Sequence, residues 1–206
     1  MSRRIAVLIS GSGTNLQALI DAQNTLDASI VQVFSNRKAA YGLTRAQNAN
    51  IPTGYLALQP YLKANPGKTR DDYDEEVARR VSESKPDLIV LAGWMHVFGD
   101  GFLNNVHAVP VINLHPALPG AFDGTNAIER AYEAFQRGEI DRSGVMVHRV
   151  VKAVDRGEPL IIREIPFLEG DSLGDFETRL HSIEWEIIVQ ATKLVLDEEK
   201  KILVLS

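Results

Sequence analysis

The sequence has no cysteine among its 206 residues. It therefore contains no disulfide, no thiolate nucleophile and no zinc or iron–sulfur site built from cysteine ligands. The apolar run that follows Arg4 ends at Ile9, which is too short for a membrane span or for the core of a signal peptide. These absences fit a reducing compartment, and we expect the protein in the cytoplasm.

Dense blocks of basic residues are also missing. The chain has 22 Lys and Arg against 27 Asp and Glu, which gives a formal net charge of −5. Tight binding to nucleic acid relies on clustered basic residues, so nucleic acid is not an expected partner, and a membrane is not expected either. What is present is an ordinary globular composition, with 45% apolar residues over a length that suits a single domain, residues 1–206.

Apolar runs and helical periodicity alternate along the first two-thirds of the chain. The runs that predict strands are residues 4–9, 30–34, 53–58, 86–93 and 109–114. Helical spacing predicts helices from residue 16 onwards and over residues 43–48, 71–84 and 126–137. Residues 59–70, with two prolines and a glycine, predict a surface loop. The alternation predicts an α/β fold, a Rossmann-like three-layer arrangement with a mostly parallel central sheet and helices on both faces.

The last third of the chain has a different pattern. Residues 144–151 and 160–166 predict a strand pair around a turn at residues 155–157. Apolar residues from Phe176 to Leu194 recur three, four or seven positions apart, which predicts a long helix, and residues 201–206 predict a last short strand. No internal repeat or linker divides the chain, so these elements are expected in the same domain.

Residues 109–116 are the most informative stretch of the sequence. An apolar run ends there in Asn113 and His115, and Pro116 stops it. Residues two apart on a strand point to the same face, so both side chains are expected at the carboxyl end of a buried strand, where open α/β sheets bind ligands. An amide can donate to a developing oxyanion and an imidazole can move protons, so the pair indicates acyl-group transfer. The alternative is a turn asparagine beside a capped histidine.

A glycine-containing loop at residues 10–15 follows the first predicted strand. It is not a dinucleotide fingerprint, because Leu16 stands at the third glycine position, and it has no Gly-Lys-Ser/Thr of a Walker A loop. Glycine lets the backbone approach a ligand, and the N–H groups at a helix start attract anions. The loop therefore indicates a site for a terminal phosphate, with Thr14 and Asn15 as side-chain donors. The alternative is a tight turn in which Asn15 caps the helix.

Two further polar residues lie near the predicted strand pair. Asp155 is in a loop bounded by glycine and proline, where an aspartate is usually a solvated turn residue. If Asp155 meets His115, its charge would hold the imidazolium form and raise the pKa of the histidine. His148 follows three apolar residues, which favours a place in the core or just behind the site.

With these residues in view, the chain resembles the glycinamide ribonucleotide formyltransferase family of folate-dependent enzymes over nearly its full length. The resemblance rests on residues 9–17 (ISGSGTNLQ), 91–95 (LAGWM), 112–116 (INLHP) and 122–127 (FDGTNA), and on Gly144, His148 and Asp155-x-Gly157. Several motifs in one order are far more specific than any one of them. The resemblance implies the formyltransferase fold, with the nucleotide side in the N-terminal half and the folate side in the C-terminal half.

The resemblance also implies a reaction. A formyl group would pass from 10-formyltetrahydrofolate to the amine of glycinamide ribonucleotide, in purine synthesis. Asn113, His115 and Asp155 would be the catalytic trio, in which Asn113 stabilises the oxyanion. Protonated His115, supported by Asp155, would share that task and help move the amine proton to the leaving folate nitrogen. The rate is then expected to depend on an ionisation of the His115–Asp155 pair.

Binding residues follow from the same resemblance. The substrate phosphate and ribose would be held by Gly13, Thr14, Asn15 and Glu184. The folate would be held by Arg70, Met95, His96, Val97, Val150, Lys152 and Ala153, partly through backbone groups that read the pterin ring. His96 departs from the family pattern, which often has arginine there. The expected partners are these two small molecules, with no metal, and the chain is expected to be a monomer or a weak homodimer.

Two other interpretations remain open. Methionyl-tRNA formyltransferase and formyltetrahydrofolate deformylase share the formyl-handling core, but they normally carry a basic C-terminal domain and an extra N-terminal domain, respectively. Here the first strand begins at once, and the chain ends soon after its helix at the acidic residues 197–199, so neither domain is expected. The second interpretation is a binding module without catalysis, in which Asn113, His115 and Asp155 are structural.

Overall fold

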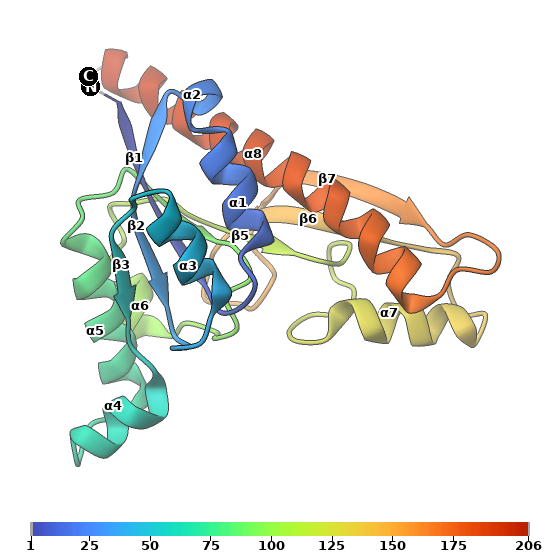
Figure 1. Ribbon diagram of the computed structural model, residues 1–206, viewed down its shortest axis with the longest axis horizontal. Coiled ribbons are helices and arrows are strands. Elements are labelled where there is room, and N and C mark those ends of the chain that lie inside the picture. Colours follow the sequence, from blue (N-terminus) through green and yellow to red (C-terminus); the bar gives the residue numbers. More distant parts are fainter. Residues whose placement is uncertain (1, 206) are drawn as a thin grey trace.

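A computed structural model of the chain describes the backbone of residues 2–205 and the side chains of residues 2–198 (Figure 1). Within these residues, seven strands form one sheet in the order β3-β2-β1-β4-β5-β6-β7. The strands are β1 (Arg3–Ile9), β2 (Ala28–Ser35), β3 (Thr53–Tyr55), β4 (Leu88–Leu91), β5 (Val111–His115), β6 (Arg142–Arg149) and β7 (Pro159–Pro166). Neighbours from β3 to β5 pair in parallel, whereas β6 pairs antiparallel with both β5 and β7. The prediction of a mostly parallel sheet is confirmed.

Helices cover both faces of this sheet. They are α1 (Thr14–Asp21), α2 (Gln23–Leu26), α3 (Tyr41–Asn48), α4 (Leu58–Ala64), α5 (Arg70–Ser82), α6 (Asp100–Leu103), α7 (Ala127–Gln136) and α8 (Leu173–Leu205). Figure 1 shows the long α8, coloured from orange to red, running next to α1 and across β6 and β7. In the described part of the chain, no helix is both long and apolar enough to cross a membrane.

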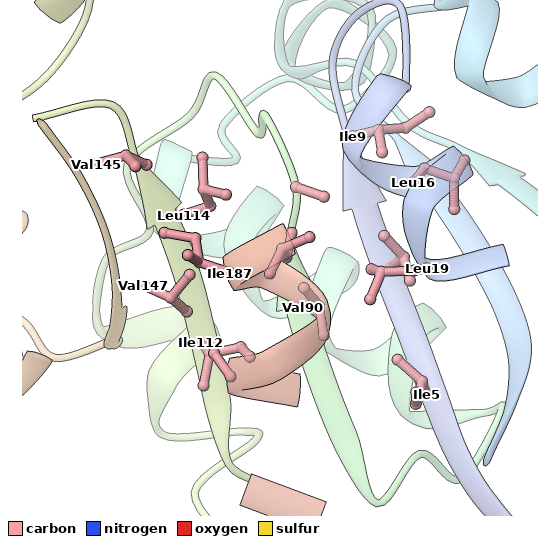
Figure 2. Packing of buried hydrophobic residues seen from close by; sticks show 14 of the residues in the cluster. Ile5, Ile9, Leu16, Leu19, Val90, Ile112, Leu114, Val145, Val147 and Ile187 are labelled. Atoms are coloured by element: carbon pink, nitrogen blue, oxygen red, sulfur yellow. The ribbon is translucent and has the colours of Figure 1, made fainter. Parts of the chain in front are cut away.

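The two faces of the sheet follow from the alternation of side chains along β1. Ile5, Val7 and Ile9 belong to one buried cluster with residues of α1 and α8, shown in Figure 2. Ala6 and Leu8 belong to the other cluster, with residues of α5 and α6. All five side chains are 0% exposed, which requires a helix layer on each face. The predicted three-layer arrangement is confirmed.

Alternation on β5 then determines where its polar residues point. Ile112 and Leu114 belong to the cluster under α8. Asn113 and His115 alternate with them and therefore point to the opposite face of the sheet. Their place at the end of the strand puts them where the buried core gives way to an open edge.

The antiparallel pairing of β5 with β6 adds a third polar residue to this face. Val145 and Val147 of β6 belong to the cluster under α8, so the intervening and following residues face the other way. In the register of the two strands, His148 lies directly opposite Asn113. Side chains of directly opposed residues are close neighbours on the sheet, so the strand pairing itself brings His148 to Asn113.

One segment predicted as a loop is partly helical. Residues 58–64 form α4, although they contain Pro60. Pro60 is the third residue of α4, and a proline in the first turn removes only an N–H group that has no partner within the helix. The prediction of a continuous loop over residues 59–70 was therefore wrong over its first half.

The predicted last strand is also absent from the described part of the chain. The helix α8 continues to Leu205, so residues 201–205 are helical, and Ser206 lies outside the described residues. Short apolar runs fit a strand and a buried helix equally well, which explains this error.

Candidate active site

A cavity of about 390 Å³ lies at the carboxyl ends of the parallel strands. The loop after β1, the segment after β4 and the end of β5 all contribute to its wall, together with residues of α8. The strand order runs from β1 through β2 to β3 on one side and from β4 to β5 on the other. Open α/β sheets bind ligands at such a switch point. The phosphate-type loop and the Asn113–His115 pair therefore share one cavity.

Close contact between two glycines shapes the loop after β1. Gly13 precedes α1 with a φ of 73°, in the left-handed region that glycine adopts without strain. A Cβ on Gly13 would lie 2.6 Å from the Cα of Gly42 in α3. Gly42 also donates its backbone N–H to the carbonyl oxygen of Gly11 at 3.1 Å. The loop is thereby held with Thr14 and Asn15 on the cavity wall at the start of α1, where N–H groups favour an anion.

Asn15 connects this loop to α8 and does not cap its own helix. Gly13 is the capping residue of α1, and it makes no side-chain cap bond. The Nδ2 group of Asn15 donates to Oε2 of Glu184 at 3.2 Å, and Nδ1 of His181 lies 2.9 Å from the same oxygen. Oδ1 of Asn15 is buried without a partner among the described residues, so it can accept from a ligand hydroxyl. The helix-cap alternative for Asn15 is wrong.

At the other end of the cavity, Asn113 contacts the imidazole opposite it on β6. Nδ2 of Asn113 lies 3.1 Å from Nε2 of His148. Nδ1 of His148 lies 2.8 Å from the carbonyl oxygen of Arg149, which can only accept, so Nδ1 carries a proton. In the neutral imidazole, Nε2 then accepts from Asn113. His148 is 3% exposed, so it lies behind the site as the sequence indicated.

Asp155 brings a carboxylate to these groups from a distant loop. Its φ of 52° is a left-handed conformation, and its Oδ2 accepts the backbone N–H of Gly124 at 2.9 Å. The same Oδ2 lies 3.5 Å from Nδ1 of His115. Its Oδ1 lies 3.4 Å from both Nδ2 of Asn113 and Nε2 of His148. An amide, two imidazoles and a carboxylate therefore converge, and the carboxylate is more than a solvated turn residue.

Burial decides the charge state of His115. It lowers the pKa of His115 below the ordinary 6.5, and the charge of Asp155 opposes this shift only in part. The charge of Asp155 raises the pKa of His115, as expected, but the net shift is downward, because a 5% exposed imidazole loses more by desolvation than a contact of 3.5 Å returns. Burial also raises the pKa of Asp155, but the neighbouring imidazole of His148 and the hydrogen bond from the Gly124 N–H outweigh it, so the net pKa is lowered and the carboxylate stays charged.

The surroundings of His115 also fix its tautomer. Nδ1 faces Asp155, and a hydrogen bond to the backbone of Phe122 likewise favours a proton on the ring. The proton of the neutral imidazole therefore lies on Nδ1, and Nε2 keeps its lone pair. Nε2 is buried and has no partner among the described residues. His115 can thus accept a proton at Nε2 while Asp155 stabilises the charge that forms.

The residues expected for the second ligand divide into two groups. Four of them line the cavity, namely Met95, His96, Val97 and Val150. The other three, Arg70, Lys152 and Ala153, are not part of the lining. Arg70 donates a hydrogen bond to the carbonyl oxygen of Val97, and Nζ of Lys152 lies 2.6 Å from a carboxylate oxygen of Asp100. These two basic residues therefore lie just outside the wall that the first group forms.

The cavity wall contains two basic residues that sequence reasoning missed. His181 precedes Glu184 by three positions on α8, a spacing that places both on one side of a helix and that could have revealed the pair. Arg37, which follows β2, also lines the cavity. The position of Arg37 just after the end of a parallel strand could have indicated that it lies at the ligand-binding edge of the sheet.

Donor atoms of His115, Asp123 and Asp155 lie within 4.8 Å of one another, as ligands of a metal would. One oxygen of each aspartate already has a donor of its own, whereas Oδ1 of Asp123 is buried without a partner among the described residues. Nη2 of Arg156 lies 2.6 Å from Oδ2 of Asp123, and the Gly124 N–H occupies Asp155. We therefore interpret this group as part of a proton-transfer site.

Comparison with known proteins shows which family this chain is similar to. A model of the formyl transferase family matches residues 3–192. The phosphoribosylglycinamide formyltransferase of Schizosaccharomyces pombe is 47% identical over 97% of this chain and 100% of its own length. The enzyme of that name from Escherichia coli is 34% identical over 89% of this chain and 82% of its own. The structure of glycinamide ribonucleotide transformylase 1 from Symbiobacterium toebii superimposes with a TM-score of 0.84 at 34% identity, covering 95% of this chain and 88% of that one.

Proposed function

Because the chain belongs to the formyl transferase family, we propose that it transfers a formyl group from 10-formyltetrahydrofolate to the amine of glycinamide ribonucleotide, in purine synthesis. The products are formylglycinamide ribonucleotide and tetrahydrofolate. The observation that carries the proposal is the convergence of Asn113, His115 and Asp155, with His115 Nδ1 and Asp155 Oδ2 3.5 Å apart, in the cavity that also contains the loop at residues 10–15.

The nucleotide substrate fits one end of the cavity, which we call the nucleotide end. Its phosphate takes the loop at Gly13, Thr14 and Asn15, where helix N–H groups attract an anion. The buried carboxylate of Glu184, 4% exposed, accepts hydrogen bonds from the ribose hydroxyls. This places the amine of the substrate toward the other end of the cavity, which we call the catalytic end.

The formyl donor fits the wall formed by Met95, His96, Val97 and Val150. Met95 and Val97 are 56% and 46% exposed and offer apolar surface to a planar ring. Among the described residues, no hydrogen bond engages the backbone N–H of His96 or Val97, so both can pair with ring heteroatoms. Arg70, Lys152 and Ala153 lie outside this wall and would meet the part of the donor that extends beyond the cavity.

In the reaction, a bond forms between the amine nitrogen and the formyl carbon, and the bond from that carbon to the donor nitrogen breaks. The amine must lose a proton and the donor nitrogen must gain one. Nε2 of neutral His115 accepts the first, and Asp155 stabilises the imidazolium that results. The same Nε2 then supplies the proton to the leaving nitrogen. Holding both reactants in one cavity adds the advantage of proximity.

Asn113 stabilises the negative charge that develops on the formyl oxygen. One N–H of its Nδ2 is directed to Nε2 of His148 at 3.1 Å. The other is held only by a longer contact of 3.4 Å to Asp155. This weaker contact leaves the second N–H free to turn to an oxyanion, and a donor aimed at developing charge is among the strongest catalytic contributions.

The proposal includes the setting of the reaction. The partners are the two small molecules, and neither a metal nor a nucleic acid takes part. The protein acts in the cytoplasm, as a monomer or a weak homodimer.

An acceptor comparison tests the function. Purified protein with 10-formyltetrahydrofolate should form product with glycinamide ribonucleotide at a rate far above formate release to water or formylation of methionyl-tRNA. Absorbance of the folate product and mass spectrometry of the acceptor measure all three. Formate release or formyl-methionyl-tRNA as the main product would instead support one of the two related activities.

A further inference from the structure

The wall segment at residues 95–97 has an anchor at each of its three residues. The Met95 N–H donates to Oγ of Ser10 at 2.7 Å. The His96 imidazole contacts Asp74 of α5, and the Val97 carbonyl accepts from Arg70. The segment lies between β4 and α6 and belongs to neither a helix nor a strand, so these bonds replace secondary structure in fixing its backbone.

The middle anchor is the most buried of the three. Nε2 of His96 lies 2.6 Å from Oδ1 of Asp74, and their side chains are 9% and 1% exposed. Oδ2 of Asp74 accepts the backbone N–H of Gly99 at 2.7 Å. One buried carboxylate therefore holds the segment at His96 and the backbone just beyond it at Gly99. A carboxylate that is nine-tenths buried needs such donors, because an unpaired buried charge is strongly unfavourable.

Aromatic packing keeps the His96 ring on Asp74. The ring makes edge-to-face contacts with Tyr73 at 5.3 Å and with Phe98 at 5.4 Å between ring centroids. Trp94 lies 6.3 Å away with its plane at 84°. With its side chain turned into this aromatic group and 9% exposed, His96 offers mainly its backbone to the cavity.

We infer that His96 and Asp74 are positioning residues for the formyl donor, which they serve by holding the backbone of residues 95–97 in the shape that the donor ring recognises. This inference rests on the proposed function. It assigns His96 no contact with the donor through its side chain and no part in proton transfer. It requires that loss of the pair weaken donor binding and leave the nucleotide end and the catalytic end intact.

The central variant is His96→Phe, which keeps an aromatic ring in the packed group and removes the hydrogen bond to Asp74. We expect the KM for 10-formyltetrahydrofolate to rise about tenfold, as loss of one hydrogen bond to a charged group allows. The kcat and the KM for glycinamide ribonucleotide should change less than about twofold. His96→Gln, whose amide can donate to Asp74, should restore most of the donor affinity. Amide hydrogen exchange of residues 95–99 should be faster in His96→Phe.

A control at an exposed aspartate exists one turn earlier on α5. Oδ1 of Asp71 accepts the backbone N–H of Gly101 at 2.7 Å, so Asp71 anchors α6 as Asp74 anchors the wall. Asp71→Ala should leave the KM for the donor unchanged, whereas Asp74→Ala should raise it. If Asp74→Ala fails to fold, the donor KM of His96→Phe can still be compared with that of Asp71→Ala, and this comparison tests the inference.

Three results would overturn the inference. The first is an unchanged donor KM in folded His96→Phe, the second is an equal rise in Asp71→Ala, and the third is a fall in kcat with the donor KM preserved. In each case the wild-type protein still forms formylglycinamide ribonucleotide, so the proposed function stands. A wild-type protein without that activity would overturn both.

Discussion

The two ends of the cavity are built from the same three kinds of side chain and differ in the direction in which they shift the pKa of their histidine. Each end has an amide and an imidazole on one carboxylate, with Asn15 and His181 on Glu184 at 3.2 and 2.9 Å, and Asn113 and His115 on Asp155 at 3.4 and 3.5 Å. At the nucleotide end, the hydrogen bond to the carboxylate raises the pKa of the histidine. At the catalytic end, burial lowers the pKa of the histidine.

Exposure and contact length explain the difference. The side chain of His181 is 41% exposed, so its charged form stays hydrated and the short contact to Glu184 dominates. The side chain of His115 is 5% exposed and its contact to Asp155 is longer. The nucleotide end therefore shifts its histidine toward the charged form, and the catalytic end shifts its histidine toward the neutral base that can accept a proton. Pairing with a carboxylate does not by itself make an imidazolium.

Removing each histidine gives the largest expected contrast. His115→Ala should lower kcat by about 10²–10⁴-fold, because the proton acceptor is lost. His181→Ala should act mainly on the KM for glycinamide ribonucleotide. Steady-state kinetics with each substrate varied, and circular dichroism to confirm folding, measure both. Full turnover in a folded His115→Ala protein would reject the catalytic assignment and leave the binding-module interpretation.

The two asparagines offer a second contrast. Asn113→Ala should reduce kcat by about 10²–10³-fold, because the donor to the developing oxyanion is removed. Asn15→Ala should weaken binding of the nucleotide and keep kcat within a few-fold. Single-turnover measurements separate the two effects. An equal loss of kcat in both variants would contradict the proposal that one end of the cavity binds the nucleotide and the other catalyses the transfer.

A smaller effect is expected from the carboxylate of the nucleotide end. Glu184→Gln keeps the shape of the side chain and removes the charge that accepts from ribose hydroxyls and from His181. We expect the KM for glycinamide ribonucleotide to rise about tenfold, with the KM for the donor unchanged. Glu186→Gln, at an exposed position on the same helix, is the control. A rise confined to the donor KM would contradict the placement of the two substrates.

The smallest effects concern pH, and they have opposite signs. The pKa of His115 is lowered in the folded state, so the unfolded chain binds the extra proton first and stability should fall as pH drops below about 6.5. The pKa of His181 is raised, so its stabilising contribution is complete below pH 6.5 and is lost as pH rises through its folded pKa. NMR titration of the imidazoles should give midpoints on opposite sides of 6.5, with His181→Gln assigning one signal. Midpoints on the same side would remove the distinction between the ends.

The sequence pattern was sufficient to predict the position of site residues where a strand determines the direction of their side chains. Alternation on β5 placed Asn113 and His115 on one face, and the loop after β1 was placed at the same edge. The meeting of Asp155 with His115 could not be derived in this way, because it depends on a left-handed residue and on the Gly124 N–H from another loop. From the sequence, the contact between Asp155 and His115 could be stated only as a possibility on which the catalytic assignment depends.

The balance between desolvation and charge interactions also could not be predicted from the sequence. The direction in which the pKa of His115 shifts depends on whether desolvation outweighs the charge of Asp155. Desolvation depends on burial, which arises from the whole fold. The pair of His96 and Asp74 was missed because nothing local links residues twenty-two positions apart. The helical turn α4 was missed for a local reason, since a proline in a first turn resembles a proline in a loop.

The contact between Gly13 and Gly42 has a consequence for the affinity with which the substrate phosphate is bound. The loop after β1 and the first turn of the helix α3 pack together before any ligand arrives, so the phosphate meets a rigid cradle. Little conformational freedom remains to be lost on association, and more of the interaction energy appears as affinity. A side chain on Gly13 would meet the backbone of Gly42, and a side chain on Gly42 would meet Ile9 of β1, so the first two β–α units are constrained to change together.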